Sequence, residues 1–247
     1  MTDPAQSAEL SLTGQRVMLT MPMHRDMDGR VAIAIAATEQ ICLAHQLPLS
    51  INKTYGTPFV DVARNKLAAL FLASDCTMMF CIDSDTLWQP PDFMRLVALC
   101  AAGLSVIGAA YVLRQDEVKF VLGGMEGEPA KTEYGCYTWP ELVMGLGFVC
   151  IAREVLEALA ERSPKLLLPN DADNNVVPRI FRNEERETKE ARARGADIQL
   201  FGEDVNFFHD VQALGRDVWL DPSVQLGHIG TKIYTADVRE HFARATP

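Results

Sequence analysis

The chain has 247 residues, of which 48% are hydrophobic and 23% are charged, and its formal net charge is −10. This length and composition predict an ordinary globular chain with one large α/β core. The negative net charge argues against an extended surface for the phosphate backbone of DNA.

Targeting and redox signals point to one compartment. Residues 1–15 are polar, with neither a basic nor an apolar stretch, and predict an N-terminal extension rather than a secretory signal. No stretch of the sequence is long and apolar enough to predict a membrane span. The six cysteines are scattered without a C-x-x-C pair and are expected to be reduced core residues. These features predict a cytoplasmic protein.

The first half of the chain alternates between predicted strands and helices. In chain order the elements are a strand at 16–20, a helix at 30–45, a strand at 49–54, a helix at 57–73, a strand at 77–82, a helix at 90–103 and a strand at 105–111. Strands that alternate with helices are typical of βαβ units. The pattern therefore predicts an α/β fold with a mostly parallel central sheet.

The second half is more irregular. Short strands are expected around the Gly-rich turn at 123–127, and a buried strand at 145–151 precedes a helix at 153–160. The densely charged segment 182–194 is predicted to be either an exposed helix or a mobile loop, because its i,i+4 charge pairs suit a solvated face. No repeat or low-complexity linker interrupts the chain, so a single domain is expected over 16–240.

Two carboxylates follow the most apolar predicted strand. Asp83-Ser84-Asp85 comes directly after the run at 77–82. Open α/β sheets bind ligands at the carboxyl ends of their strands, and Mg²⁺ or Mn²⁺ prefers carboxylate oxygens together with substrate phosphates. The tripeptide therefore predicts either a metal site for a diphosphate or an ordinary turn, because Asp and Ser are also common turn residues.

A second group of candidate residues lies near the C-terminus. Glu203 and Asp204 precede a predicted helix at 205–214, and His228 follows a short strand and turn. Acids in a first helical turn are also explained by the helix dipole, and a single histidine is usually structural. Imidazole can nevertheless complete an oxygen and nitrogen ligand set around Mn²⁺.

Five motifs occur in a fixed order over residues 15–235. They are Pro22, Ala63-Arg64-Asn65, Asp83-Ser84-Asp85, Gly202-Glu203-Asp204 and His228-Ile229-Gly230. This ordered set resembles the GT-A glycosyltransferases, and family 2 in particular. The resemblance implies a single Rossmann-like domain for nucleotide-diphospho-sugar transfer, with residues 16–112 as the nucleotide-binding half and 113–240 as the acceptor and catalytic half.

The resemblance also implies roles for individual residues. It assigns binding of a nucleotide-sugar donor to Pro22, His24, Arg64, Asp83, Ser84 and Lys232. It implies Mn²⁺ or Mg²⁺ on Asp85 and His228, with Asp83 as a further metal ligand. Asp204 would accept the proton of an acceptor hydroxyl, and Glu203 would orient the acceptor or this base. A carboxylate base on the face opposite the diphosphate would invert the anomeric centre.

The donor base is less clearly specified than the metal site. Family 2 members usually carry an acidic residue and a Ser-X-Asp cluster after the second strand, where this chain has Ile-Asn-Lys-Thr-Tyr at 51–55. A UDP-sugar is the default expectation, and a GDP-sugar is the alternative.

Other functions stay open. A nucleotidyltransferase that makes nucleotide-sugars should carry a Gly-rich loop after the first strand, where this chain has no glycine before Gly29. A non-catalytic protein that binds nucleotide-sugars would not need Asp204. The acceptor is a saccharide, a protein, a metabolite or a modified DNA base, with contacts expected from residues 166–200.

Overall fold

The structure, a computed structural model, describes residues 11–24, 26–168 and 176–245. Most of the predicted N-terminal extension of residues 1–15 lies outside the described residues. Within the described ranges, no helix has the length and hydropathy needed to cross a membrane. All six cysteines are buried and free, as expected for reduced core residues.

Helices and strands alternate through the first hundred residues and then become shorter. The helices are α1 (Gly29–Ala44), α2 (Val60–Ala73), α3 (Pro90–Ala101), α4 (Arg153–Arg162), α5 (Lys189–Ala193), α6 (Glu203–Ala213) and α7 (Val238–Ala245). The longer strands are β1 (Val17–Pro22), β2 (Leu49–Thr54), β3 (Met78–Ile82) and β10 (Phe148–Ala152). The three-residue strands are β5 (Val106–Gly108), β11 (Lys165–Leu167), β12 (Val176–Pro178), β13 (Glu184–Arg186), β14 (Gln199–Phe201) and β16 (Gly227–Ile229). The two-residue strands are β4 (Thr86–Leu87), β6 (Leu122–Gly123), β7 (Ala130–Lys131), β8 (Tyr137–Thr138), β9 (Val143–Met144), β15 (Trp219–Leu220) and β17 (Ile233–Tyr234).

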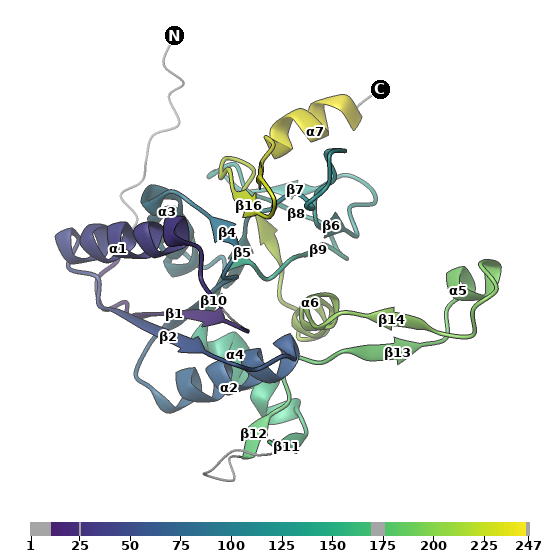
Figure 1. The fold of residues 1–247 in the computed structure, drawn as a ribbon, viewed down its shortest axis with the longest axis horizontal. Helices are drawn as coiled ribbons and strands as arrows, with labels where there is room; N and C mark the ends of the chain where they lie inside the picture. The colour runs from purple at the N-terminus through teal and green to yellow at the C-terminus, as the bar shows by residue number, and fades with distance from the viewer. Residues whose placement is uncertain (1–10, 25, 169–175, 246–247) are drawn as a thin grey trace.

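A central sheet in the order β2-β1-β3-β10-β5-β15-β8-β7 organises the chain. Helices α1 and α3 cover one face of this sheet, and α2 and α4 cover the other (Figure 1). Strand β3 lies between β1 and β10 and is buried on both faces. A strand in that position must be apolar on both sides, which explains the unbroken apolar run before Asp83.

The two faces of β3 contribute to two separate cores. Phe80 and Ile82 pack with α1 and α3, whereas Met79 and Cys81 pack with α2 and α4. Successive side chains of a strand point to opposite faces, so one short strand serves both layers. Packing on both faces therefore fixes the position of β3, and with it the start of the Asp83-Ser84-Asp85 segment.

The expectation of a mostly parallel sheet is wrong, because the sheet is mixed. Strand β1 pairs in parallel with β2 and β3, but β10 runs antiparallel to both β3 and β5. A parallel connection needs a crossover that returns the chain to the other end of the sheet, usually a helix. No helix lies between β5 and β10. The chain therefore enters β10 at the edge of the sheet where β3 ends, and β10 runs in the direction opposite to β3.

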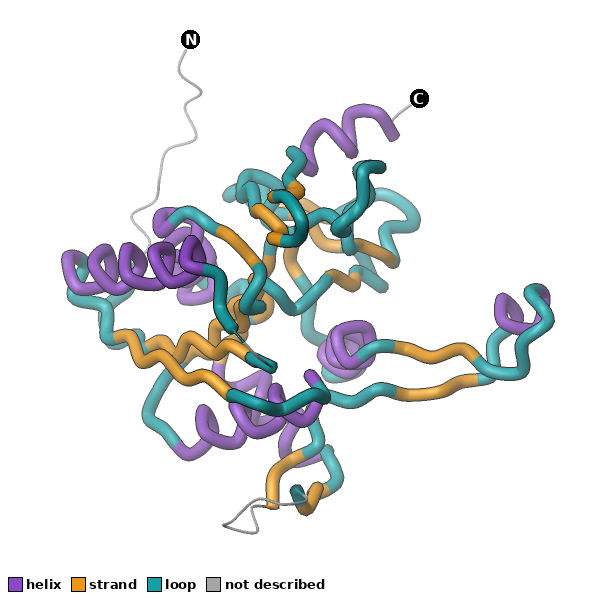
Figure 2. The backbone as a smooth tube through the Cα atoms, viewed as in Figure 1, coloured by secondary structure: helices purple, strands orange, loops and turns teal. Residues whose placement is uncertain are grey.

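Two hairpins extend away from the sheet. Strands β13 and β14 pair antiparallel and carry α5 at their tip, and β11 pairs with β12 (Figure 2). The charged segment 182–194 is therefore mostly a strand and a short helix of a hairpin, not one exposed helix or a loop. Its ion pairs lie within this hairpin or with α6, as in the contact of Arg182 with Asp210.

Asn65 on α2 ties the hairpin region to the sheet. Its side-chain amide donates to the backbone oxygen of Phe181 at 2.7 Å, and its side-chain oxygen accepts from the Phe181 N–H at 2.9 Å. Asn65 is 1% exposed, so water does not replace these bonds. The Asn of the Ala63-Arg64-Asn65 motif is thus structural, and the adjacent Arg64 is left to face the site.

We predict that Asn65→Leu lowers the free energy of unfolding by about 2–4 kcal/mol, because both backbone groups of Phe181 lose their partner in a buried place. Urea denaturation with an unchanged m-value measures this loss. Leu70→Ala is the matched control on the same helix, since Leu70 is 52% exposed and its truncation should cost less than about 1 kcal/mol. Equal effects of the two substitutions would contradict the role of Asn65.

Candidate functional site

The two aspartates lie on a tight turn at the carboxyl end of β3. The N–H of Asp83 donates to the backbone oxygen of Gly147 at 3.2 Å, and the N–H of Thr86 donates to that of Asp83 at 3.1 Å. The segment is thus a turn, which was one alternative for Asp83-Ser84-Asp85, and this turn presents two carboxylates at the edge of the sheet; the metal site stays a prediction. Their side chains are 25% and 31% exposed.

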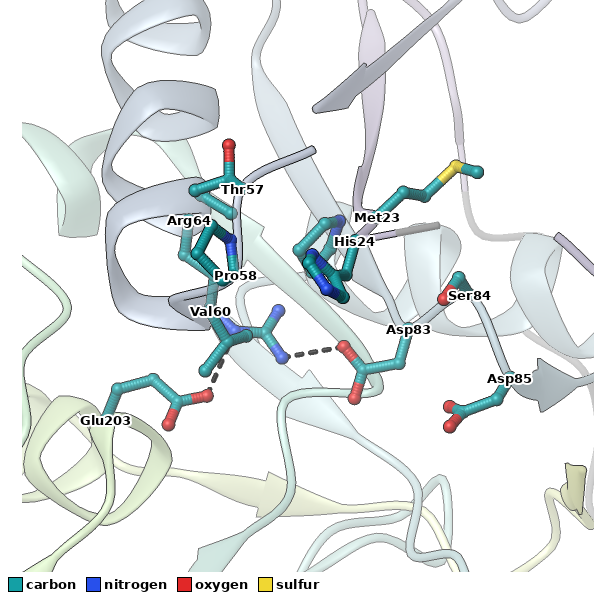
Figure 3. A pocket seen from close by; sticks show the side chains of 12 residues that line it. Met23, His24, Thr57, Pro58, Val60, Arg64, Asp83, Ser84, Asp85 and Glu203 are labelled. Atoms are coloured by element: carbon teal, nitrogen blue, oxygen red, sulfur yellow. Dashed lines mark hydrogen bonds and ion pairs between the residues drawn. The ribbon is translucent and has the colours of Figure 1, made fainter. Parts of the chain in front are cut away.

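A buried arginine joins the turn to the start of α6. Arg64 Nη2 donates to Asp83 Oδ1 at 2.7 Å, and Arg64 Nε donates to Glu203 Oε1 at 3.2 Å (Figure 3). The Arg64 side chain is only 4% exposed. Burial alone would lower its pKa, but the charges around it, that of Asp83 foremost, raise the pKa instead. Arg64 therefore stays charged and fixes both carboxylates in place.

A cavity of about 340 Å³ opens beside this arginine. It is lined by Pro22, Met23, His24, Thr57, Pro58, Val60, Ala63, Arg64, Asp83, Ser84, Asp85 and Glu203. The structure thus brings most of the predicted donor-binding residues around one space, and Figure 3 shows the carboxylates of Asp83, Asp85 and Glu203 at its wall. Lys232 is not among the lining residues; it pairs with Asp116 at 2.5 Å on an exposed turn.

His228 faces Asp85 from a different part of the chain. Strand β16 pairs with β4, opposing His228 to Thr86, and places His228 Nε2 at 3.6 Å from Asp85 Oδ2. The other ring nitrogen, Nδ1, lies 2.8 Å from the backbone oxygen of Val112. A carbonyl can only accept, so Nδ1 carries a proton, and Nε2 is the ring nitrogen that faces Asp85.

Asp85 and His228 are the two facing side chains that could hold a divalent cation. Burial alone would raise the pKa of Asp85, but His228 and the Arg114 guanidinium outweigh it and hold the pKa below its usual range. In the described part of the chain no group of three or more His, Cys, Asp or Glu side chains forms a complete metal site. Two protein ligands suffice where phosphate oxygens and water supply the rest, as is common for Mg²⁺. Asp83, held by Arg64, is the less available carboxylate.

The two acids at the start of α6 differ from ordinary surface carboxylates. Burial raises the pKa of Asp204, although its Oδ1 accepts a 2.8 Å hydrogen bond from the N–H of Val205. Burial likewise raises the pKa of Glu203, with Arg64 acting in the opposite direction. A raised carboxylate pKa lies closer to neutral pH, where a general base works best. Asp204 is thus the stronger candidate for proton transfer, and Glu203 is held by its arginine.

Tyr111 is a site residue that sequence reasoning missed. It lies beyond β5, and its ring stacks edge-on against His228 with ring centroids 5.0 Å apart. A Cβ on Gly145 would come within 2.1 Å of the Tyr111 hydroxyl, and one on Gly147 would come within 2.9 Å of Asp83. The two glycines therefore make room for the tyrosine and the aspartate. The signal that could have found it is the tyrosine at the end of the strand predicted at 105–111, together with the Gly-x-Gly pattern at 145–147.

Arg114 is the second residue that the sequence did not single out. Its Nη2 lies 3.0 Å from Asp85 Oδ2, and its side chain is half exposed. It belongs to the irregular segment after β5, where no periodicity predicts which side chain reaches the sheet edge.

Two buried polar groups at the site have no partner. Within the described residues, the buried side-chain nitrogen and oxygen atoms without a hydrogen bond are Arg64 Nη1, Thr86 Oγ1 and Thr138 Oγ1. Such atoms cost free energy, and folded proteins keep few of them. Two of the three, Thr86 Oγ1 and Arg64 Nη1, lie next to the aspartate turn. Functional sites commonly keep such unsatisfied groups.

The predicted acceptor segment, residues 166–200, is only partly described. Residues 169–175 lie outside the described residues, and the remainder forms most of the two hairpins. Glu203 and Asp204 follow directly at the base of the β13–β14 hairpin, so this hairpin leads into the candidate catalytic residues.

We predict that Asp204→Asn stabilises the protein at neutral pH. A raised folded-state pKa means that the unfolded chain releases its proton first, so the free energy of unfolding falls as pH rises through that range. The charge therefore costs stability at pH 7, and the neutral amide removes the cost while still accepting from Val205. Thermal unfolding should show a gain of roughly 2–4 °C, which shrinks as the pH is lowered through the folded-state pKa of Asp204.

Asp210→Asn is the matched control for this prediction. Asp210 lies on the same helix but bonds Arg182, so losing its charge should lower the melting temperature. If both substitutions lowered it equally, Asp204 would be an ordinary helix-start acid.

Comparisons with known proteins support the fold alone. No protein-family model and no curated protein matches the sequence. The crystal structure of A197 from STIV is similar with a TM-score of 0.52 and 18% identity, over 87% of this chain and 86% of A197. The crystal structure of GalNAc-T7 with UDP, GalNAc and Mn²⁺ has a TM-score of 0.44 and 12% identity, over 87% of this chain and 44% of that one. The similarity to A197 shows a shared fold. The similarity to GalNAc-T7 is too low to support any conclusion.

Proposed function

We propose that this protein is a metal-dependent glycosyltransferase of the GT-A type, which moves a sugar from a nucleotide-diphosphate donor to an acceptor hydroxyl. The observation that carries the proposal is the pairing of Asp85 with His228 beside the cavity of Arg64, Asp83 and Glu203. A cation site next to a polar cavity at the carboxyl edge of an α/β sheet suits a nucleotide joined to a diphosphate. No family model matches the sequence, so membership of family 2 is part of this proposal.

The donor is assigned to the wall of the cavity. Pro22 and His24 line the side nearest β1, and Asp83 and Ser84 line the side nearest β3. All the lining residues except Glu203 come from residues 16–112, which supports treating that half as the nucleotide-binding part and 113–240 as the acceptor part. A UDP-sugar is the first choice of donor and a GDP-sugar the second.

Divalent cation chemistry would meet the main electrostatic demand of the reaction. Mn²⁺ or Mg²⁺ on Asp85 and His228 would neutralise the charge that develops on the departing diphosphate. The Val112 carbonyl keeps the His228 ring in the orientation that this ligation needs. Lys232 would have to leave Asp116 to reach the phosphates.

The acceptor chemistry is assigned to the start of α6. Asp204 accepts the proton of the acceptor hydroxyl as the hydroxyl oxygen bonds the anomeric carbon. The bond from that carbon to the diphosphate oxygen breaks in the same displacement, and the anomeric centre inverts. Glu203, oriented by Arg64, positions the acceptor or Asp204. The raised pKa of Asp204 supports its role as the base.

Two substitutions test the separate roles proposed for Asp204 and Asp85. With Mn²⁺ and a panel of UDP- and GDP-sugars, the purified protein should release nucleoside diphosphate from one donor. Asp204→Asn should keep metal-dependent donor binding and lower kcat by about 10²-fold or more, because the proton has no acceptor. Asp85→Ala should lose donor binding itself, as measured by titration calorimetry.

The reverse pattern would overturn the assignment of these roles. If no donor of the panel gave nucleoside diphosphate release or metal-dependent thermal stabilisation, the glycosyltransferase proposal would fail.

A further inference from the structure

Arg114 occupies the carboxylate oxygen that the proposed cation needs. Its Nη2 lies 3.0 Å from Asp85 Oδ2, the same atom that lies 3.6 Å from His228 Nε2. If a divalent cation bound between Asp85 and His228, two positive groups, the cation and the Arg114 guanidinium, would lie next to the one carboxylate of Asp85. Arginine and such a cation would therefore compete for Asp85, and half of the arginine side chain is exposed.

The surroundings of Arg114 keep it close to Asp85 rather than in solvent. Its Nη1 lies 3.4 Å from the backbone oxygen of Ile229. Its aliphatic part lies over Gly230, where a Cβ would come 2.9 Å from Arg114 Cδ. The glycine after Ile229 thus leaves space for the arginine stem against the strand that carries His228.

The turn that carries Arg114 is also fixed. The N–H of Leu113 donates to the backbone oxygen of Lys119 at 2.8 Å, and Val112, which holds His228, forms a bridge with Phe120. The base of the turn is therefore part of the same framework as the proposed metal ligand. Only the end of the Arg114 side chain has to rotate for the guanidinium to leave Asp85.

We propose that Arg114 is the counter-ion of Asp85 in the metal-free protein and becomes a ligand of the donor diphosphate once a divalent cation takes Asp85. This inference rests on the proposed function. The guanidinium fork suits phosphate oxygens, and a diphosphate on the cation would be the nearest new anion. Cation binding then releases the arginine that the donor needs, so metal and donor bind cooperatively.

The test uses two affinities that should change in opposite directions. Arg114→Ala should bind Mn²⁺ alone about threefold more tightly than the wild type, because a competing cation is gone. The same variant should bind UDP in saturating Mn²⁺ about tenfold more weakly, because a charged phosphate contact is lost. Free Mn²⁺ is followed by its EPR signal, and UDP binding is followed by titration calorimetry.

Two control variants separate this role from a general effect of charge or structure. Arg114→Lys retains the charge and should keep Mn²⁺ affinity near that of the wild type, with UDP affinity within about threefold. Arg16→Ala removes one positive charge at the opposite edge of the sheet, where Arg16 pairs with the exposed Asp75, and should change neither affinity.

The outcomes also separate this inference from the proposed function. If the wild type binds Mn²⁺ and UDP but Arg114→Ala does not tighten the first and weaken the second, the inference is wrong and the proposed function stands. If the wild type binds neither, both are wrong.

Discussion

The ion pairs of the buried Arg64 are the interaction on which the site depends. They connect Asp83, at the end of β3, with Glu203, at the start of α6, although 120 positions separate the two acids in the chain. A buried cation without partners costs several kcal/mol, so the three side chains hold one another in place. The relative position of the aspartate turn and of Asp204 follows from this network.

A second constraint sets the part of the site that is proposed to bind the metal. The pairing of β16 with β4 brings His228 to Asp85, and the N–H of Ile229 donates to the backbone oxygen of Asp85 at 2.8 Å. The candidate cation ligands are thus joined by backbone hydrogen bonds, while Arg64 joins Asp83 to Glu203. The guanidinium of Arg114, 3.0 Å from Asp85 Oδ2, offsets part of the negative charge at this place.

The sequence predicted the local features well and the long-range geometry less well. The apolar run of β3 and the motif acids were identifiable, because burial on both faces and carboxylate chemistry leave direct traces in residue type. The direction of β10 was not identifiable from the sequence, because it depends on the path of an irregular segment without a crossover helix. Tyr111 and Arg114 reach the site through that same segment, where neither periodicity nor a motif marks them.

The most direct test of the account is pulsed EPR on the complex of the protein with Mn²⁺ and UDP. The account predicts that one bound Mn²⁺ couples both to ³¹P of the diphosphate and to ¹⁴N of an imidazole, and that His228→Gln removes the nitrogen coupling. Phosphorus coupling without any nitrogen coupling in the wild type would contradict it, because the nucleotide would then carry Mn²⁺ without His228.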